Sequence, residues 1–366
     1  MILPDGFYAS GIRCGIKKKG RDLGLILVDG FACSAGVFTT NINCSYSVTL
    51  SKKHVKNPIK AVIVNSGNAN CFTHKNGLKD TMKICLCLSE FLGVKKENIL
   101  IASTGIIGKR LPLSKIKAAI PHLISNISRR GDDFSESILT TDTFPKMVSL
   151  KVNLKGKTVK IIGFAKGAGM INPFMATMLG FVLTDAKIKR SLLQKILVDA
   201  VEDSFNSITI DGCMSTNDCV FVLASGRSAV VQKDTDVKKF KEAIKKVLVG
   251  LARMIVKDAE GATKFIILKI EGAKTKEEAK RAAFCIANSS LFKTAMYGEN
   301  PNWGRIVAAL GAVGIKVGEK KLKILSSSLK KKEIVIRINL NRGKYAKTIY
   351  TSDLTPQYVK INAGYS

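Results

Sequence analysis

Short apolar runs separated by polar turns fill the first half of the chain, and this pattern predicts buried β-strands. Asp29-Gly30 directly follows the first run and is typical of a turn that ends a strand. The run at 61–64 leads into the amide-rich sequence 65–70, a common way to present polar groups at a site. The expected strands lie at 25–28, 36–38, 61–64, 99–102, 147–154 and 157–164.

Apolar residues recur at helical spacing over 78–92, and Gly93 is suited to end that helix. After the midpoint of the chain the pattern becomes more helical. The apolar face at 192–201 predicts a helix, and Ser191 and Gln194 are spaced as a capping box at its start.

The last third of the chain mixes both patterns. A long amphipathic helix is expected over 237–251, and a further helix begins at Thr275, where Glu278 completes a capping box. Residues 334–340 alternate apolar and polar, as in a strand with one wetter face. The chain is therefore expected to form an α/β layered sandwich with a smaller C-terminal α/β domain, with a boundary near 275–290.

The stretch 166–185, near the midpoint, has a composition that no strand or helix alone explains. It is glycine-rich, then broken by Pro173, then small at Ala176 and hydroxylic at Thr177, before an apolar run. A threonine after a small residue and before a buried strand suggests a chain that cuts itself there, leaving an N-terminal threonine as nucleophile. The alternative is a glycine-rich turn that feeds a core strand, with Thr177 merely packed.

The formal charge of +31 raises nucleic acid as a partner. However, the lysines are spread over the whole length, and aromatic residues make up only 7% of the chain. No basic stripe with interleaved aromatic residues is present, so the lysines indicate solvated faces. A basic nucleic-acid-binding protein stays as the less favoured alternative. The longest near-apolar run, at 170–183, is too short to span a bilayer, and the N-terminus has no signal-peptide pattern, so no membrane partner is expected.

The nine cysteines are scattered without a CxxC pair, which argues against a zinc site and indicates reduced thiols in a cytoplasmic protein. The three histidines are His54, His74 and His122, and all fall in regions expected to be surface. A Ser-His-Asp catalytic triad is therefore difficult to form. This makes the α-amine of a cut chain the best base. Its pKa of about 7.7–8.0 suits neutral pH better than that of lysine, about 10.4. No metal or cofactor is expected.

Acyl chemistry also needs hydrogen-bond donors for an oxyanion, and the glycine-punctuated sequence 103–108 is the best candidate, through Thr104 and Gly105. The order of several motifs along nearly the whole chain resembles the ornithine acetyltransferase (ArgJ) family. These motifs are 36–41, 65–70, 103–108, 140–143, 166–185, 204–218, 293–305 with Asn302-Trp303-Gly304-Arg305, and the tail 361–366.

The resemblance implies a layered αββα-like sandwich and a precursor that cuts itself between Ala176 and Thr177. The products would be an α chain of residues 1–176 and a β chain of residues 177–366, assembled as an α₂β₂ heterotetramer. Thr177 would carry an acetyl group from N²-acetylornithine to glutamate, and some members of the family also accept acetyl-CoA.

The resemblance also implies roles for individual residues. Thr104 and Gly105 correspond to the oxyanion hole. The substrate-binding positions fall on Thr143, Lys166, Thr177, Glu260, Asn362 and Ser366. Cys213 departs from the family pattern, which usually has an acid there, and the tail is one residue short after Tyr365. An aminopeptidase or amidase with the same nucleophile is the other enzyme class that fits.

Overall fold

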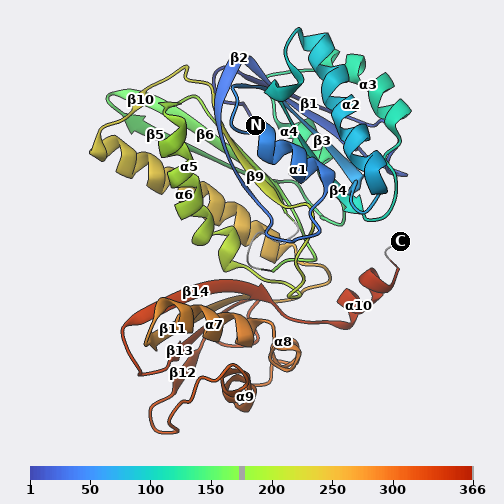
Figure 1. Cartoon of the computed structure of the whole chain (residues 1–366). Coiled ribbons are helices and arrows are strands. Elements are labelled where there is room, and N and C mark those ends of the chain that lie inside the picture. Colours follow the sequence, from blue (N-terminus) through green and yellow to red (C-terminus); the bar gives the residue numbers. More distant parts are fainter. Residues whose placement is uncertain (173–177, 365–366) are drawn as a thin grey trace. The chain divides into compact units, whose positions relative to one another are not determined.

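A computed structural model of the chain describes residues 1–172 and 178–364 (Figure 1). The described residues form two compact units. The larger contains Met1–Gly167, the described part of Phe174–Asn206, and Met214–Ala252. The smaller contains the described parts of Ala168–Pro173, Ser207–Cys213 and Arg253–Ser366.

An eight-stranded sheet, counted over the described residues, organises the larger unit. Its strand order is β4-β3-β2-β9-β7-β6-β5, with β1 paired to β2. All six runs expected to form strands lie in it, and the runs at 25–28 and 36–38 are parts of one long strand, β2. The strands of the sheet are β1 (Phe7–Ile12), β2 (Leu23–Phe38), β3 (Ile59–Asn68), β4 (Ile99–Ile106), β5 (Lys146–Leu154), β6 (Lys157–Lys166), β7 (Leu179–Thr184) and β9 (Cys219–Ala224).

Strand β2 belongs to both halves of this sheet. It pairs with β3 as far as Ala32 and with β9 from Cys33 onward, and the register with β3 shifts between Leu27 and Ala32. Gly30, with φ of +81°, lies within that irregular stretch. The expected turn at Asp29-Gly30 is therefore wrong, because the pair forms a bulge that redirects one long strand instead of ending a short one.

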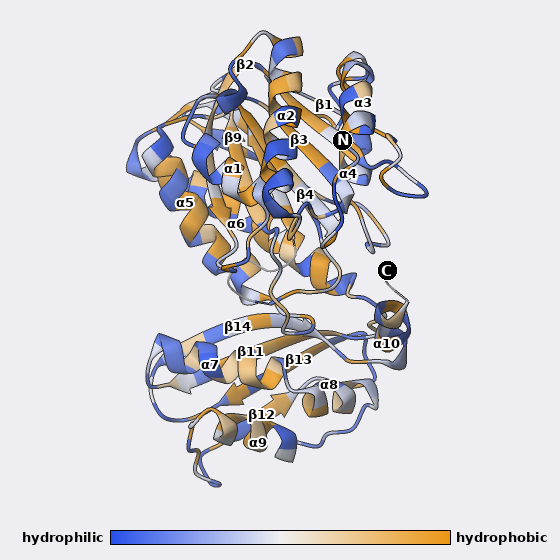
Figure 2. Cartoon of the chain, turned by 45° about the vertical axis from the view of Figure 1, so that its right-hand side comes forward, coloured by the Kyte–Doolittle hydropathy of each residue, from blue (hydrophilic) through white to orange (hydrophobic). Residues whose placement is uncertain are grey.

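The two halves of the sheet pack face to face as the inner layers of a sandwich. Val62 and Leu100 come from one half, and Phe164, Phe181 and Phe221 from the other, all in one buried cluster. Successive residues of a strand point to opposite faces, so the alternate positions on each half face helices. Figure 2 shows the strands of this unit as mainly hydrophobic and its helices as mixtures of hydrophobic and hydrophilic residues.

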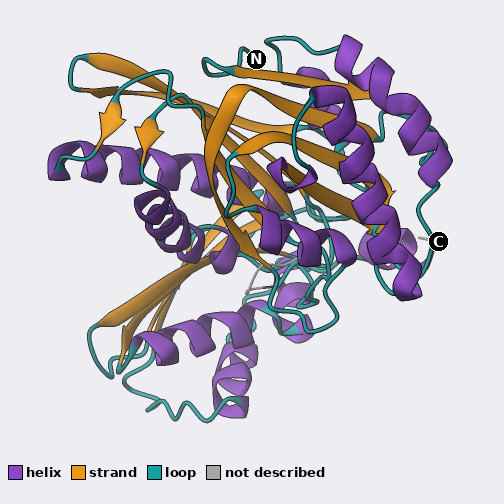
Figure 3. Cartoon of the chain, turned by 45° about the horizontal axis from the view of Figure 1, so that its top comes forward, coloured by secondary structure: helices purple, strands orange, loops and turns teal. Residues whose placement is uncertain are grey.

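Helices cover both outer faces of the sandwich (Figure 3). Ile63 and Ile101 pack in a second buried cluster with residues of α2 (His74–Leu92) and α3 (Leu113–Ser125). The opposite face is covered by α5 (Arg190–Glu202) and α6 (Asp234–Lys257). Gly163 of β6 leaves room for side chains of α6 there. The predicted α/β fold with αββα layering is confirmed.

Helix ends agree with local sequence at some positions and differ at others. Gly93 ends α2 in a left-handed conformation, as expected. At the start of α5, however, no side chain caps the helix. The predicted capping box is wrong because Gln194 instead bonds both backbone groups of Gly36. The remaining elements of the unit are α1 (Tyr46–His54), α4 (Asp132–Ser137), the 3₁₀ turn Lys96–Asn98, and the short pair β8 (Lys187–Ile188) and β10 (Val230–Val231). A second 3₁₀ turn, Phe205–Ser207, begins in the larger unit and ends in the smaller.

The smaller unit is a four-stranded sheet with helices packed on it. The sheet order is β12-β13-β11-β14, with β11 parallel to β13 and antiparallel to β14. Ile334, Ile336 and Ile338 of β13 are buried, as their alternation predicts. The elements are β11 (Phe265–Ala273), α7 (Lys276–Ala287), α8 (Ser290–Tyr297), α9 (Gly304–Ala312), β12 (Lys323–Ser326), β13 (Glu333–Asn339), β14 (Tyr345–Ser352) and α10 (Pro356–Ala363).

The smaller unit takes in residues from Arg253 onward, ahead of the range 275–290 expected for a boundary. The reason is that β11, which precedes that range, supplies the central strand between β13 and β14. No helix in the described ranges is both long and apolar enough to cross a membrane.

Candidate active site

Thr104 and Gly105 lie near the end of β4, where it runs parallel to β3. Gly105 stands opposite Gly67 and has φ of +134°. A Cβ atom there would lie 2.3 Å from the carbonyl carbon of Gly67. Only glycine fits this close approach of two backbones. The glycine-punctuated sequence 103–108 is therefore extended backbone as far as Ile106, and it places Thr104 in a buried position.

Lys166, the last residue of β6, is buried and reaches the same region. Its Nζ atom donates to Oγ1 of Thr140 at 2.7 Å and to Oγ1 of Thr104 at 3.4 Å. The ammonium group also lies 3.8 Å from Oδ2 of Asp142. The structure thus joins two residues, Lys166 and Thr104, that the sequence assigns to one site from positions 62 residues apart.

Asp142 is the centre of a buried charge cluster that sequence reasoning missed. Its Oδ1 atom accepts hydrogen bonds from Nζ of Lys146 and from the backbone N–H of Gly167, both at 2.6 Å. Burial alone would raise the pKa of Asp142. The ammonium groups of Lys166 and Lys146 and the N–H of Gly167 outweigh it and lower this pKa to about 2. The carboxyl group is therefore ionised throughout the neutral range.

Lys17 brings a further ammonium group to this cluster. Its Nζ atom donates to the carbonyl oxygen of Leu139 at 2.9 Å, next to the Thr140 that binds Lys166. Burial lowers the pKa of Lys17, and the charge of Lys166 lowers it further, while Asp22 and Asp142 act in the opposite direction. The carboxylate of Asp22 accepts hydrogen bonds from the backbone N–H groups of residues 14–17. Three lysines and one aspartate make a cluster suited to a carboxylate ligand.

Ala176 and Thr177 lie outside the described residues, but the residue that follows them is held firmly. The backbone N–H of Met178 donates to Oδ1 of Asp218 at 2.7 Å. Asp218 is fully buried, and burial raises its pKa well above the usual value. The N–H of Met178 and the charge of Lys166 oppose that rise only in part.

In the smaller unit, Glu260 and Asn362 are in direct contact. Oε2 of Glu260 accepts a hydrogen bond from Nδ2 of Asn362 at 2.8 Å. The backbone N–H of Glu260 donates to the carbonyl oxygen of Ala168 at 2.9 Å. The Glu260 carboxylate also packs closely on Gly169, where a Cβ atom would lie 2.4 Å from Oε2 and would displace the carboxylate.

Asp211 holds the same segment in place. Its carboxylate accepts hydrogen bonds from the backbone N–H groups of Met170 at 2.5 Å and Ile171 at 2.9 Å. It also accepts from the hydroxyl of Tyr358 at 3.3 Å, on the helix that carries Asn362. Burial raises the pKa of Asp211, and burial together with the charge of Asp211 raises the pKa of Tyr358.

A model of the ArgJ family matches residues 8–366. The chain belongs to the ArgJ family. A relative from Chlorobaculum tepidum, named arginine biosynthesis bifunctional protein ArgJ, is 42% identical over 387 residues, which cover 99% of this chain and 96% of the relative. A relative of the same name from Caldanaerobacter subterraneus is 40% identical over 392 residues, covering 99% and 97%. A crystal structure of the argJ protein from Bacillus halodurans is 36% identical, covers 48% of this chain and 92% of that chain, and superposes with a TM-score of 0.45.

Membership of the ArgJ family confirms the resemblance read from the motif order. The roles of individual residues stay predictions. Thr104, Gly105 and Lys166 lie together in the larger unit, and Thr143 is exposed directly after Asp142. Glu260 and Asn362 lie together in the smaller unit. Ser366, like Ala176 and Thr177, lies outside the described residues.

Histidine plays no part in these two clusters. The expectation that all three histidines are solvated is wrong for His54, which is buried with Nδ1 2.8 Å from the carbonyl oxygen of Ile99. His74 and His122 are exposed. Over residues 1–172 and 178–364, no group of three or more His, Cys, Asp or Glu side chains is placed to hold a metal ion.

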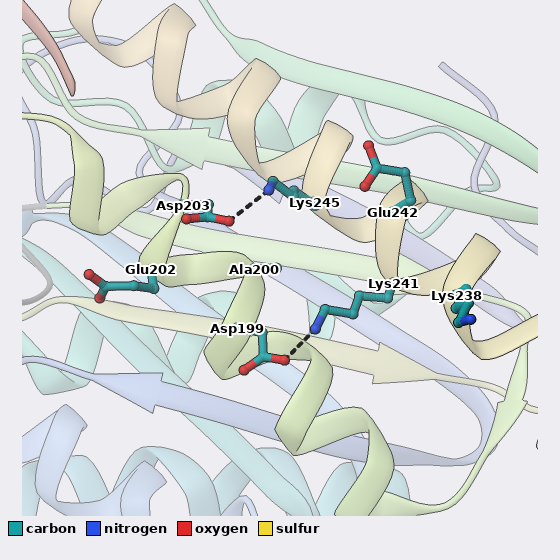
Figure 4. Close-up of a pocket in the computed structure, with 8 residues that line it drawn as sticks. All are labelled: Asp199, Ala200, Glu202, Asp203, Lys238, Lys241, Glu242 and Lys245. Carbon is teal, nitrogen blue, oxygen red and sulfur yellow. Dashed lines mark hydrogen bonds and ion pairs between the residues drawn. The ribbon is translucent and has the colours of Figure 1, made fainter. Parts of the chain in front are cut away.

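The ArgJ-family chain also has a hollow of about 550 Å³ between α5 and α6 (Figure 4). Lys241 and Lys245 of α6 pair across it with Asp199 at 2.5 Å and Asp203 at 2.6 Å. Both pairs are largely exposed, and such pairs contribute little to stability. The hollow contains none of the predicted site residues.

Proposed function

We propose that this chain is a glutamate N-acetyltransferase of arginine biosynthesis, of the ornithine acetyltransferase type, that carries an acetyl group from N²-acetylornithine to glutamate. The relatives' names support the pathway. The observation that carries the proposal is the buried contact between Lys166 and Thr104, in a cluster rich in ammonium groups. Donor and acceptor both bear an α-carboxylate, and such a cluster suits that group.

The proposed nucleophile is Thr177, freed by self-cleavage of the Ala176–Thr177 bond. Its Oγ1 atom attacks the acetyl carbonyl carbon of N²-acetylornithine, and its own α-amine accepts the hydroxyl proton. The tetrahedral intermediate expels the amine of ornithine, which takes that proton and leaves acetyl-threonine. The amine of glutamate then attacks this ester, and its proton returns to Oγ1 through the α-amine.

The proposed oxyanion donors are Thr104 and Gly105. Because a lysine ammonium group only donates hydrogen bonds, Oγ1 of Thr104 acts as acceptor toward Lys166. The hydroxyl proton of Thr104 is then available for another acceptor, and a developing oxyanion is the strongest one nearby. A single donor of this kind typically contributes about 10²–10³ in kcat.

The proposed substrate-binding residues divide by charge. Lys166 and Thr143 bind the α-carboxylate shared by N²-acetylornithine and glutamate. Glu260 and Asn362 bind the amine-bearing part of the substrates, since the Glu260 carboxylate is already fixed by Asn362. Ser366 is proposed as a further binding residue on the strength of the family pattern alone. Acetyl-CoA is proposed as a possible second acetyl donor, and no bound cofactor is required.

The mature enzyme is proposed to be an α₂β₂ heterotetramer of the fragments 1–176 and 177–366. A cytoplasmic location is proposed because all nine cysteines are free thiols and lie within the described residues. Reduced thiols are typical of that compartment.

The proposal is tested by denaturing electrophoresis followed by N-terminal sequencing and acetyl-transfer assays. We expect two fragments, one starting at Thr177, and transfer from N²-acetylornithine to glutamate. Acetyl-CoA tested in parallel decides whether it serves as donor. The variant Thr177→Ala should remain one uncut, inactive chain. An intact wild-type chain that still transfers acetyl groups would overturn the mechanism, and release of acetate that glutamate does not suppress would indicate a hydrolase.

A further inference from the structure

Two consecutive residues of the larger unit, Asn217 and Asp218, bond to backbone groups directly beside the residues on which the proposed chemistry depends. Nδ2 of Asn217 donates to the carbonyl oxygens of Ser103 and Ala69, both at 2.7 Å. Ser103 directly precedes the proposed oxyanion donor Thr104. Oδ1 of Asp218 accepts the N–H of Met178, which directly follows Thr177.

We propose that Asn217 and Asp218 are positioning residues that set the placement of the threonine nucleophile relative to the oxyanion donor. The inference rests on the proposed function. Neither side chain is assigned contact with the substrate. They act by fixing the backbone next to Thr104 at one end and next to Thr177 at the other, and we call the pair the Asn217–Asp218 bridge.

The side-chain amide of Asn217 is fixed in orientation by its hydrogen bonds. Both N–H groups of its side chain are used by Ser103 and Ala69, and its Oδ1 atom accepts the hydroxyl of Thr216 at 2.6 Å. The residue is buried, so rotating the amide would leave several buried polar groups unpaired at once. The position of Ser103 is therefore tied to residue 217.

The Asp218 end fixes the start of β7 in the same way. Met178 donates its N–H to Asp218 and accepts a hydrogen bond from the N–H of Cys219 at 3.4 Å. Cys219 begins β9, which runs parallel to β7 with Leu179 opposite Cys219. The carbonyl of Asp218 in turn accepts the N–H of Thr39 at 2.9 Å. Both backbone groups of Met178 are thus bound by consecutive residues.

The chemistry of Asp218 distinguishes positioning from a role of its charge. Its second oxygen, Oδ2, is buried and has no hydrogen-bond partner among the described residues. Burial favours the neutral acid, as its raised pKa indicates. A neutral carboxyl group that works through one accepting oxygen is closely matched by an amide. Asp218→Asn should therefore retain function, whereas Asp218→Ala removes the acceptor for Met178.

The test uses the full-length chain with the variants Asn217→Ala, Asp218→Ala and Asp218→Asn. The rate of self-cleavage, kcat, KM for both substrates and Tm are measured for each. We expect Asn217→Ala and Asp218→Ala to slow both self-cleavage and kcat by about tenfold to a hundredfold, with KM changed less than about threefold, because small misplacements of reacting groups have effects of this size. Asp218→Asn should stay within about threefold of the wild type in every rate.

Ser34→Ala is the matched control, because the buried Ser34 hydroxyl donates to the carbonyl of Val55 at 2.8 Å, away from the bridge. It should lower Tm without slowing either reaction. The inference fails if Asp218→Ala behaves like Ser34→Ala, if KM rises while kcat stays unchanged, or if Asp218→Asn is as slow as Asp218→Ala. If Asn217→Ala does not fold, the two Asp218 variants still decide between these outcomes. A wild type that neither cuts nor transfers refutes the proposed function itself, and the bridge with it.

Discussion

Removing the carboxylate of Asp142 tests whether the buried charge cluster determines stability and activity together. In Asp142→Asn the ammonium groups of Lys146 and Lys166, whose side chains are 0% and 3% exposed, lose the negative charge between them. Breaking a buried ion pair by removing one partner typically costs about 3–5 kcal/mol. The variant should therefore unfold at clearly lower urea concentration at pH 7, and kcat/KM for N²-acetylornithine should fall because Lys166 loses its ionic partner.

The pKa of Asp142 gives an independent estimate of the same interaction. The fall from 3.8 to about 2 corresponds to about 2 kcal/mol of stability at neutral pH. The mutational cost is larger, because the substitution also leaves two buried ammonium groups without their anionic partner. Since the pKa is lowered on folding, the contribution is complete above about pH 4 and is lost as the pH falls toward 2.

The assay is urea unfolding of the wild type and Asp142→Asn between pH 2 and 7, with kcat/KM measured at neutral pH. The difference in the free energy of unfolding should be about 2–5 kcal/mol at pH 7 and should shrink below pH 4. Asp133→Asn is the control. The Asp133 side chain is 54% exposed and pairs with Arg21, so losing this ion pair should cost less than about 1 kcal/mol. A difference below about 1 kcal/mol for Asp142→Asn, or one that does not change with pH, would refute this reasoning.

Three further substitutions probe other parts of the two units. Gly105→Ala should destabilise the chain by several kcal/mol in urea unfolding and abolish activity, because its Cβ atom would lie 2.3 Å from the backbone of Gly67; unchanged stability would contradict the close approach. Glu260→Gln should raise KM for the amine-bearing substrate about tenfold in steady-state assays with little change in Tm, because the bond to Asn362 can survive while the charge does not. Burial lowers the pKa of Lys293 to about 8, so the free energy of unfolding should rise by up to about 3 kcal/mol between pH 8 and 10.5, and Lys293→Met should lack that rise in pH-dependent urea unfolding.

The sequence was informative wherever the determining interactions are local. The helix over 78–92 with Gly93 at its end, and the alternation over 334–340, follow from spacing alone, and both are present. The bulge at Gly30 was missed because the redirection of β2 depends on which strands pair with it. The prediction that Gln194 caps a helix was wrong, because its side chain binds the backbone of Gly36, 158 positions away.

The candidate site shows the same division. Motif order pointed to Lys166 and Thr104, and the fold brings them together. Asp142 lies in the motif 140–143 but was given no role of its own, and Lys146 was not singled out because one more lysine in a chain with 59 basic residues carries no local signal. The burial of His54 was likewise invisible, because its partner is the carbonyl of Ile99, 45 residues away.

The order of strands in the larger unit has a consequence for the two proposed fragments. β7 and β9 belong to the fragment that starts at Thr177, yet they lie in the sheet between β2 and β6 of the other fragment. The fragments would therefore be interleaved, joined by the β2–β9 and β6–β7 hydrogen-bond ladders on both sides. Separating them requires opening the sheet itself, so a cut chain should dissociate only as fast as it unfolds. A single peptide bond can then be lost without releasing either product.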